Sequence, residues 1–301
     1  MLETFSQTLP NGTTLACRAS GTRGRPVLLF LHGFPEGAFV WDALLQHFSR
    51  PENGGWRCVA PFLRGFSPSS QPAEVEAYRA RLLVQDLQQL LALESPTAPL
   101  GALVAHDWGG AVAWAWANQQ PEAMQRLLIL NSPHPGTFLR ELRDNPAQQA
   151  ASAYMAFLAR PDAEALLAED DFERLWGFLR PADSPQDPPW LTPALKDQYR
   201  EVWRAGLRGG CNYYRVTPLR PGQADALTLP DSLLRIEVPT RVLWGLQDHA
   251  LLPGLLEGLE QWVPHLELYR HGQASHWIVH EDPDWVCAQL QDFLRTPPPQ
   301  R

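Results

Sequence analysis

The stretch AHDWGG, residues 105–110, sets one acidic side chain among small and aromatic residues. It follows the apolar run Leu100–Val104 and precedes a helix-like segment, so Asp107 is expected at a sharp turn between a buried strand and a helix. Ala105 and Gly109 flank this aspartate at the spacing of the small residues in the elbow motif G-x-S-x-G. An aspartate in such a place can also act only as a helix cap. Its surroundings make Asp107 a candidate nucleophile.

Three further motifs supply partners for such a nucleophile. HGFP, residues 32–35, follows an apolar run at the loop position that contributes a backbone N–H to an oxyanion hole. LWGLQD places Asp248 just after a later apolar run, and GQASHW places His276 after the last one. The chain order Asp107, Asp248, His276 is therefore nucleophile, acid and base.

The base is chosen from nine histidines by its position in the chain. His271 is expected at the end of the preceding strand, and His280 lies nearer the following helix. His276 stands between them in the loop. We therefore expect His276 to be the base.

Apolar runs of four to eight residues bounded by turn signals predict the elements that position these side chains. Alternating residues around the Asn-Gly turn of Phe5–Ala19 predict an antiparallel hairpin, and Leu266–Arg270 predicts a last strand. Unbroken runs predict strands buried on both faces of one parallel sheet: Pro26–Gly33, Trp56–Pro61, Leu100–Ala105, Arg126–Asn131 and Thr240–Gly245. Helices are expected at Ala77–Leu93, Ala111–Asn118, Arg140–Leu167, Leu195–Arg208 and Asp284–Leu294. Alternating strands and helices predict a doubly wound α/β sheet with ligands beyond its carboxyl ends.

The alternation stops over residues 135–229, which instead contain helical segments and a proline-rich loop at Pro181–Pro193. We expect this part to be a helical cap inserted into an α/β core made of residues 1–134 and 230–301.

Four motifs carry a resemblance to a known family: HGFPE, LRGFSPS (Leu63–Ser69), AHDWGG and NSPHP (Asn131–Pro135). Through them the chain resembles the α/β-hydrolase superfamily over almost its full length, and within it the epoxide hydrolases, which are related to haloalkane and fluoroacetate dehalogenases. The resemblance implies the α/β-hydrolase fold, a doubly wound and mostly parallel sheet with a helical lid inserted after the sixth strand. Phe62 departs from the pattern, because relatives usually carry aspartate there in DLRG.

An aspartate in place of serine indicates attack on saturated carbon. Serine would form an ether there, whereas a carboxylate forms an ester that water can hydrolyse once His276 removes its proton. Asp248 would hold the imidazole tautomer. Negative charge then develops on Asp107 itself, and the backbone N–H groups of Phe34 and Trp108 are the candidate oxyanion donors.

An epoxide and a halide are the two leaving groups that suit this nucleophile. An epoxide oxygen needs a proton donor, for which phenols are suited. The resemblance places Tyr154, in AYMAFLARP, and Tyr214, in CNYYR, at the two lid tyrosines of the epoxide hydrolases. Tyr213 is a competitor whose side chain should point elsewhere. Both tyrosines could alternatively only pack the lid.

The halide alternative depends on tryptophan N–H donors. Trp108 matches a halide-binding tryptophan, with lid partners available at Trp176, Trp190 and Trp203. Phe34 weakens this hypothesis, because many haloalkane dehalogenases carry a polar side chain there. A third hypothesis is a relative that binds a ligand without turnover. Phe34, Trp108 and the two lid tyrosines are the expected substrate-binding residues, and the expected ligand is a small apolar epoxide or alkyl halide, with water.

Composition excludes several other function classes. A net charge of −8 disfavours nucleic acid and anionic membranes as partners. The four cysteines lack metal-site spacing, and all catalytic groups are side chains, so we expect no metal and no cofactor. Residues 1–10 contain no leader pattern and no apolar run could span a bilayer, which favours the cytoplasm. The oligomeric state is left open.

Overall fold

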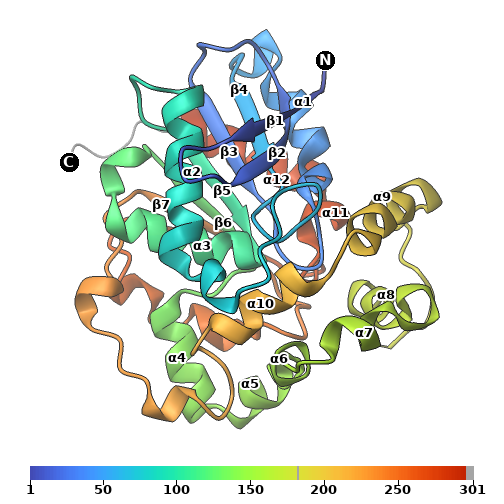
Figure 1. The fold of residues 1–301 in the computed structure, drawn as a ribbon. Helices are drawn as coiled ribbons and strands as arrows, with labels where there is room; N and C mark the ends of the chain where they lie inside the picture. Colours follow the sequence, from blue (N-terminus) through green and yellow to red (C-terminus); the bar gives the residue numbers. More distant parts are fainter. Residues whose placement is uncertain (182, 296–301) are drawn as a thin grey trace.

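The computed structural model describes residues 1–181 and 183–295, and an eight-stranded sheet forms its centre (Figure 1). The strand order is β1-β2-β4-β3-β5-β6-β7-β8. β2 runs antiparallel to β1 and β4, and the strands from β3 to β8 run parallel, which confirms the predicted hairpin and sheet. The strands are Glu3–Thr8, Thr14–Ser20, Val27–Leu31, Arg57–Pro61, Ala102–His106, Leu127–Leu130, Thr240–Gly245 and Leu266–His271.

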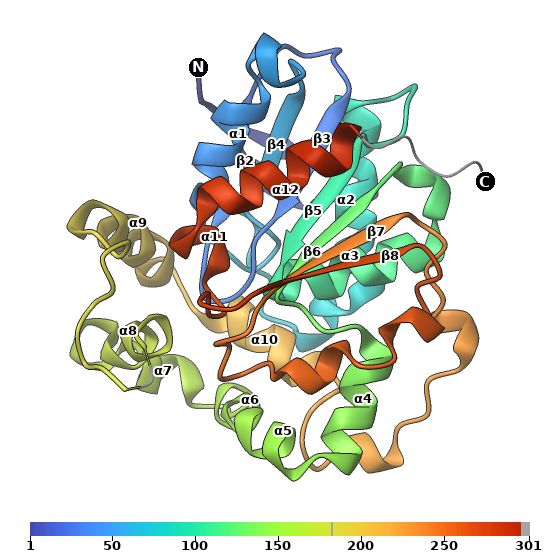
Figure 2. The ribbon, with the colours of Figure 1, turned by 180° about the vertical axis from the view of Figure 1, so that it is seen from behind.

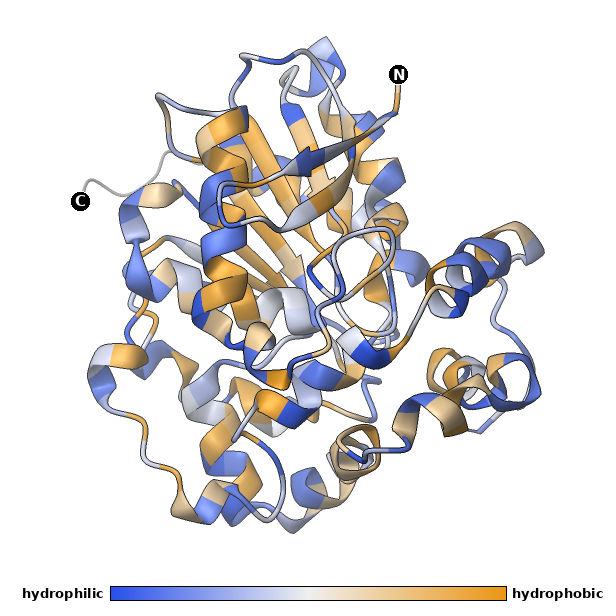
Figure 3. Cartoon of the chain, viewed as in Figure 1, coloured by the Kyte–Doolittle hydropathy of each residue, from blue (hydrophilic) through white to orange (hydrophobic). Residues whose placement is uncertain are grey.

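Helices cover both faces of the sheet. α2 (Ala80–Glu94) and α3 (Asp107–Gln119) lie on one face, and α1 (Asp42–Phe48) and α12 (Pro283–Arg295) lie on the other (Figures 1 and 2). All residues of β3 to β7 are consequently buried, and Figure 3 shows the apolar colour concentrated on these strands. This double cover explains why the strands are continuous apolar runs instead of alternating ones.

The chain reverses its direction across the sheet at β3, because β4 pairs with one edge of β3 and β5 pairs with the other. The loops that follow β3 and β5 therefore leave the sheet side by side at its carboxyl end. Doubly wound sheets bind their ligands at such a switch point. HGFP and Asp107 both lie there.

Over the described residues between β6 and β7, the chain forms seven α-helices, which lie beyond the carboxyl ends of the strands (Figures 1 and 2). They are α4 (Pro135–Asp144), α5 (Pro146–Ala151), α6 (Tyr154–Leu158), α7 (Ala163–Ala168), α8 (Glu173–Leu179), α9 (Pro193–Arg204) and α10 (Arg208–Val216). A short α11 (Ile278–Glu281) precedes α12. The sequence segment 135–229 expected as a cap contains Ala182, and the expected core ends with residues 296–301; these positions lie outside the described residues.

Two of the predicted helices were wrong in extent. Arg140–Leu167 is four helices, because Asn145 ends α4 with extended backbone and caps α5, whose first residue is Pro146. Leu195–Arg208 is interrupted after Arg204, where Gly206 has a φ of 137° that a helix cannot contain. These breaks let the chain turn repeatedly over the end of the sheet.

Arg64, in the LRGFSPS motif, ties several of these elements together. Its guanidinium donates to both carboxylate oxygens of Asp86 in α2, at 2.8 and 2.6 Å, and to the Thr13 hydroxyl at 2.8 Å. Its carbonyl accepts from the Tyr213 hydroxyl of α10 at 2.8 Å. Phe62, two residues before Arg64, is buried against the rings of Phe39 and His32. Aromatic contacts therefore surround the position at which relatives usually carry aspartate.

Replacing Asp86 with alanine should strongly destabilise the fold, because the Arg64 charge would remain buried without its carboxylate. We expect a loss of about 3–5 kcal/mol in the free energy of unfolding, measured by urea denaturation. Asp162→Ala is the matched control, since its pair with Arg160 is half exposed and should cost less than about 1 kcal/mol. Equal losses in the two variants would contradict the anchoring role of Arg64.

Candidate active site

Asp107 occupies the predicted turn. It is the first residue of α3, four residues earlier than the sequence suggested, and its φ of 49° is unusual for a residue with a side chain. The two glycines that follow allow this approach: a Cβ on Gly109 would lie 2.6 Å from the Leu31 carbonyl oxygen, and one on Gly110 would lie 2.3 Å from Ser132. The turn therefore presses α3 against β3 and fixes the direction of the aspartate side chain.

The loop after β3 holds one oxygen of this carboxylate. The backbone N–H of Phe34 donates to Asp107 Oδ1 at 2.8 Å. Gly33 makes that approach possible, because a Cβ there would lie 2.2 Å from the same oxygen. The Phe34 N–H thus contacts the Asp107 carboxylate, and the oxyanion role of the backbone N–H groups of Phe34 and Trp108 stays a prediction.

His276 lies between the two predicted acidic partners. Its Nδ1 donates to Asp248 Oδ2 at 2.7 Å, and its Nε2 lies 3.7 Å from Asp107 Oδ2. The loops after β5, β7 and β8 bring these three residues together from positions up to 169 residues apart. The hydrogen bond to Asp248 keeps the proton on Nδ1 in the neutral ring, which leaves Nε2 directed at Asp107.

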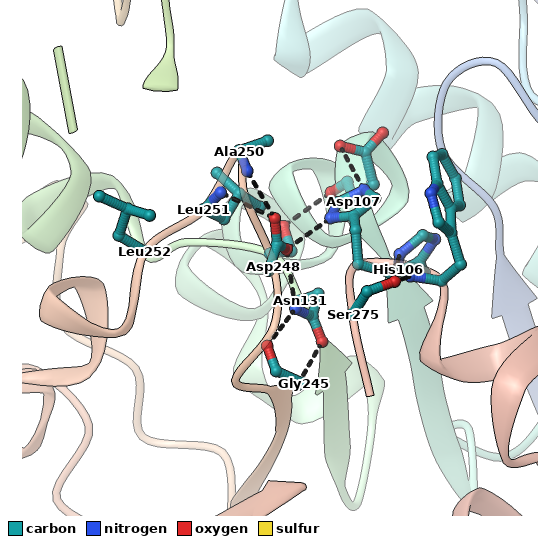
Figure 4. A network of polar contacts seen from close by, with 12 residues as sticks. His106, Asp107, Asn131, Gly245, Asp248, Ala250, Leu251, Leu252 and Ser275 are labelled. Atoms are coloured by element: carbon teal, nitrogen blue, oxygen red, sulfur yellow. Dashed lines mark hydrogen bonds and ion pairs between the residues drawn. The ribbon is translucent and has the colours of Figure 1, made fainter. Parts of the chain in front are cut away.

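Asp248 is fully buried and is held by a ring of donors (Figure 4). The backbone N–H groups of Ala250 and Leu251 each donate to Oδ1 at 2.9 Å, and the Asn131 amide donates to Oδ2 at 2.8 Å. Asn131 in turn accepts from the backbone N–H of Gly245 at 2.8 Å. The sequence marks Asn131 only as part of NSPHP, as a polar residue immediately after a buried strand.

The buried charges shift the pKa values of the pair. Burial disfavours ionisation of Asp248, but the charge and hydrogen bond of His276 outweigh it and lower the pKa of this carboxyl. Burial also opposes protonation of His276, yet the carboxylates of Asp248 and Asp107 raise the pKa of the imidazole to about 9. An imidazolium between two carboxylates is therefore the favoured state at neutral pH.

Both predicted tyrosines line one cavity with Asp107 and His276. The rings of Tyr154, from α6, and Tyr214, from α10, lie 6.0 Å apart at 75°. Burial raises the pKa of each hydroxyl above its usual value, and nearby negative charges add to the shift. The hydroxyls consequently keep their protons and can act as donors. Tyr213 points away and donates to the Arg64 carbonyl, as expected for the adjacent residue.

The cavity has a volume of about 710 Å³ and opens beyond the carboxyl ends of the strands. Apolar and aromatic residues of its wall include Phe34, Leu158, Phe178 and Trp277. Within the described part of the chain, no cluster of side chains is suited to hold a metal ion, and no helix is long and apolar enough to cross a membrane.

Two of the tryptophans considered for a halide, Trp176 and Trp203, donate their indole N–H groups to backbone carbonyls. The indole N–H of Trp203 donates to the Pro35 carbonyl at 2.7 Å, and that of Trp176 donates to the Asp171 carbonyl at 2.8 Å. Trp190 stacks on His280. Trp108 packs edge-to-face on Tyr214 at 5.1 Å and is not among the described residues that line the cavity. These contacts do not aim the indoles of Trp176 and Trp203 at a leaving group.

The competing histidines belong to other contacts. His271, the last residue of β8, lies 3.1 Å from the Asp282 carboxylate and accepts from the Ala274 N–H. His280 Nε2 lies 2.8 Å from Glu36. His276 is the histidine that faces Asp107.

Sequence reasoning also missed the buried Glu36, the last residue of HGFPE. Its carboxylate contacts His106 at 3.0 Å and His280 at 2.8 Å, and accepts from the Tyr199 hydroxyl of α9 at 3.1 Å. Burial raises its pKa, but the two histidines outweigh burial and pull the pKa well below its usual range. His106 Nε2 donates to the His276 carbonyl at 2.9 Å, so this network supports the loop that carries the histidine.

Comparisons with known proteins identify the family. Residues 26–283 match the model of the alpha/beta hydrolase fold family. The chain is 31% identical to epoxide hydrolase 3 of Xenopus tropicalis, over 92% of this chain and 73% of that protein. It is 32% identical to the AB hydrolase superfamily protein YfhM of Bacillus subtilis, over 95% of this chain and 96% of that protein.

Solved structures agree with these sequence matches. The epoxide hydrolase of Bacillus megaterium, solved with an inhibitor, superposes with a TM-score of 0.88 at 30% identity, covering 97% of this chain and 100% of that one. A mutant of that enzyme was solved in complex with its product, a naphthyloxy-propanediol. The match to the family model and the relatives above 30% identity show that this chain belongs to the α/β-hydrolase fold family and, within it, to the epoxide hydrolases.

Proposed function

We propose that this chain opens an apolar epoxide to a vicinal diol through a covalent ester on Asp107. The observation that carries the proposal is that one cavity contains a carboxylate at a strained elbow, two buried phenols and a histidine paired with a second carboxylate. The naphthyloxy-propanediol product of the Bacillus megaterium relative supports a diol product.

In the first step Asp107 attacks a ring carbon. The Phe34 N–H holds Oδ1, so Oδ2 forms the new bond to carbon while the ring C–O bond breaks. Tyr154 and Tyr214 donate hydrogen bonds to the ring oxygen, and one of them transfers its proton to the developing alkoxide. The product of this step is a hydroxyalkyl ester of Asp107.

In the second step water hydrolyses the ester. His276 Nε2 removes a proton from water, and the hydroxide attacks the Asp107 carbonyl carbon. Negative charge then collects on Oδ1, the oxygen that the Phe34 N–H already contacts, with the Trp108 N–H as second donor. Collapse restores the carboxylate and releases the diol, whose departing oxygen takes the proton of the added hydroxyl, and the proton taken from water leaves His276 as the imidazolium of the free enzyme.

The charge of Asp107 explains why His276 becomes a base only after the ring has opened. Asp107 is one of the negative charges that hold the pKa of His276 at about 9 in the free enzyme. Ester formation neutralises Asp107, so the imidazolium loses a partner, its pKa falls, and its proton passes through water to the tyrosinate formed in the first step. The alkylation itself therefore converts His276 into the base that the second step requires.

Residues 135–229 act in this proposal as a cap on a core formed by 1–134 and 230–301. Helices α6 and α10 of this segment carry the two lid tyrosines, whereas Asp107, Asp248 and His276 follow strands of the sheet. The cap thus supplies the acid, and the core supplies the nucleophile and base.

Replacing His276 with glutamine should stop the reaction at the ester. Glutamine retains polarity but cannot take a proton from water, so the enzyme should gain the mass of one epoxide on Asp107. Intact-mass and peptide spectrometry after exposure to styrene oxide measure this adduct. Asp107→Asn is the control and should remain unmodified. A variant that binds the diol but shows no adduct would exclude the covalent route.

Replacing both Tyr154 and Tyr214 with phenylalanine should slow ring opening by roughly 10²–10⁴-fold, because the alkoxide would leave without a proton donor. Stopped-flow measurement of the alkylation step gives this rate. Tyr213→Phe is the matched control: it removes a neighbouring hydroxyl that bonds Arg64 away from the cavity, so ring opening should persist. Alkylation by the double variant at the wild-type rate would remove the tyrosines from the mechanism.

The rate of ester hydrolysis should depend on pH, with a midpoint at lower pH than the titration midpoint of His276 in the free enzyme. Only neutral His276 is a base, so the rate should rise as pH increases through its pKa, which alkylation lowers from about 9. Decay of preformed alkyl-enzyme between about pH 5 and 10 gives one midpoint, and NMR titration of His276 in the free enzyme gives the other. Coincident midpoints would refute the charge switch.

A further inference from the structure

Gly177 occupies an unusual position in the cavity wall. It lies within α8, where glycine lacks the helix-forming preference of alanine, and its backbone angles need no glycine. A Cβ built on it would have no atom within 4 Å apart from its chain neighbours and the backbone of its own helix. Neither backbone strain nor a close neighbour therefore explains the missing side chain.

The surroundings of Gly177 connect it to the reacting groups. Gly177 lies in the last turn of α8, and it lines the cavity together with the residues that follow it, through the extended C-cap Arg180 to Pro181. The adjacent Phe178 also lines the cavity, and its ring lies 6.1 Å from that of Tyr154. Gly177 is exposed, so a side chain there would extend from the rim of this wall into the open space next to Phe178, the residue that contacts a lid tyrosine.

The size of that space exceeds what a small epoxide needs. Cavities of roughly 300–1,000 Å³ bind drug-sized ligands, and this one measures about 710 Å³. Its wall close to the reacting groups is aromatic: Phe34 contacts Tyr214, Phe178 contacts Tyr154, and Trp277 contacts His276. These rings favour an apolar substituent on the substrate.

Charges in the wall disfavour an anionic substituent. Arg180 is the one arginine or lysine among the described lining residues, and its guanidinium donates to Asp187 at 2.8 Å and to Glu173. Asp183 and Glu281 also line the cavity, and Glu281 accepts from Ser275. A carboxylate on the substrate would meet acids and an arginine that is already paired.

We propose that Gly177 is a specificity-determining residue that opens this wall for epoxides with a bulky, uncharged apolar substituent. The proposal rests on the proposed function and names the substrate class of the same site. The absent side chain leaves room for the substituent beside Phe178, while Asp107 and the tyrosines act on the ring at the other end.

Gly177→Ala, Gly177→Leu and Gly177→Trp test this inference. Turnover of naphthyl glycidyl ether should fall stepwise in this order, with a loss in kcat/KM of at least about tenfold for the leucine variant. Turnover of epoxybutane should remain close to wild type. Arg174→Leu adds apolar bulk to the same helix at an exposed residue outside the lining and should affect neither substrate. Thermal midpoints should stay equal to or above that of the wild type, because alanine and leucine favour a helix over glycine.

Each result decides one of the two proposals. Equal losses on both epoxides, or no loss on the bulky one, would overturn the role of Gly177. Faster turnover of a naphthyl glycidyl ether that carries a carboxylate than of the uncharged one would overturn the charge preference. If the wild type turned over no epoxide, the proposed function would fail. Calorimetric binding of the naphthyl diol would then test the role of Gly177 separately. Weaker binding by Gly177→Leu than by the wild type supports the inference, and equal binding contradicts it.

Discussion

The close approach of α3 to the end of β3 is the constraint on which the rest of the site depends. Asp107 takes a left-handed backbone conformation, which costs of order 1–3 kcal/mol for a residue with a side chain. Gly33, Gly109 and Gly110 each stand where a Cβ would overlap its neighbours. Packing of the buried sheet supplies the energy to hold this turn, and the result is a carboxylate whose Oδ1 is fixed by a backbone N–H and whose Oδ2 faces His276.

Two buried carboxylates lie near this turn, and each contacts histidine side chains. Asp248 and Glu36 are both buried, and each keeps a pKa below its usual range because imidazoles and hydrogen-bond donors compensate its burial. One carboxylate orients His276 through its Nδ1, and the other supports the same loop through His106. The carboxylates of Asp248 and Asp107 raise the pKa of His276, which a site without these charges could not do.

Local sequence patterns predicted the strands and the turn whose residue types are set by burial and close packing. The apolar runs identified β3 to β7 because burial on both faces demands them, and small residues around Asp107 identified the elbow. Family resemblance, and not spacing, singled out Tyr154 and Tyr214, and helical geometry correctly separated Tyr214 from Tyr213.

The residues that sequence reasoning missed are those recruited by tertiary contacts. Asn131 reaches Asp248 across 117 residues, and Glu36 reaches His280 across 244, so no local pattern identifies the partner of either one. The helices between β6 and β7 were merged because their apolar periodicity continues through Asn145 and past Arg204, whereas capping and a single glycine conformation decide where they stop.

The most direct measurement of the central claim follows solvent oxygen into the protein. One turnover in ¹⁸O-enriched water, with enzyme in excess, is followed by digestion and mass spectrometry of the peptide that contains Asp107. The account predicts that the label enters the Asp107 carboxylate, because water attacks the ester carbonyl carbon, while the diol keeps unlabelled oxygen. Label in the diol and none in Asp107 would show that water attacks the epoxide directly and would contradict the covalent mechanism.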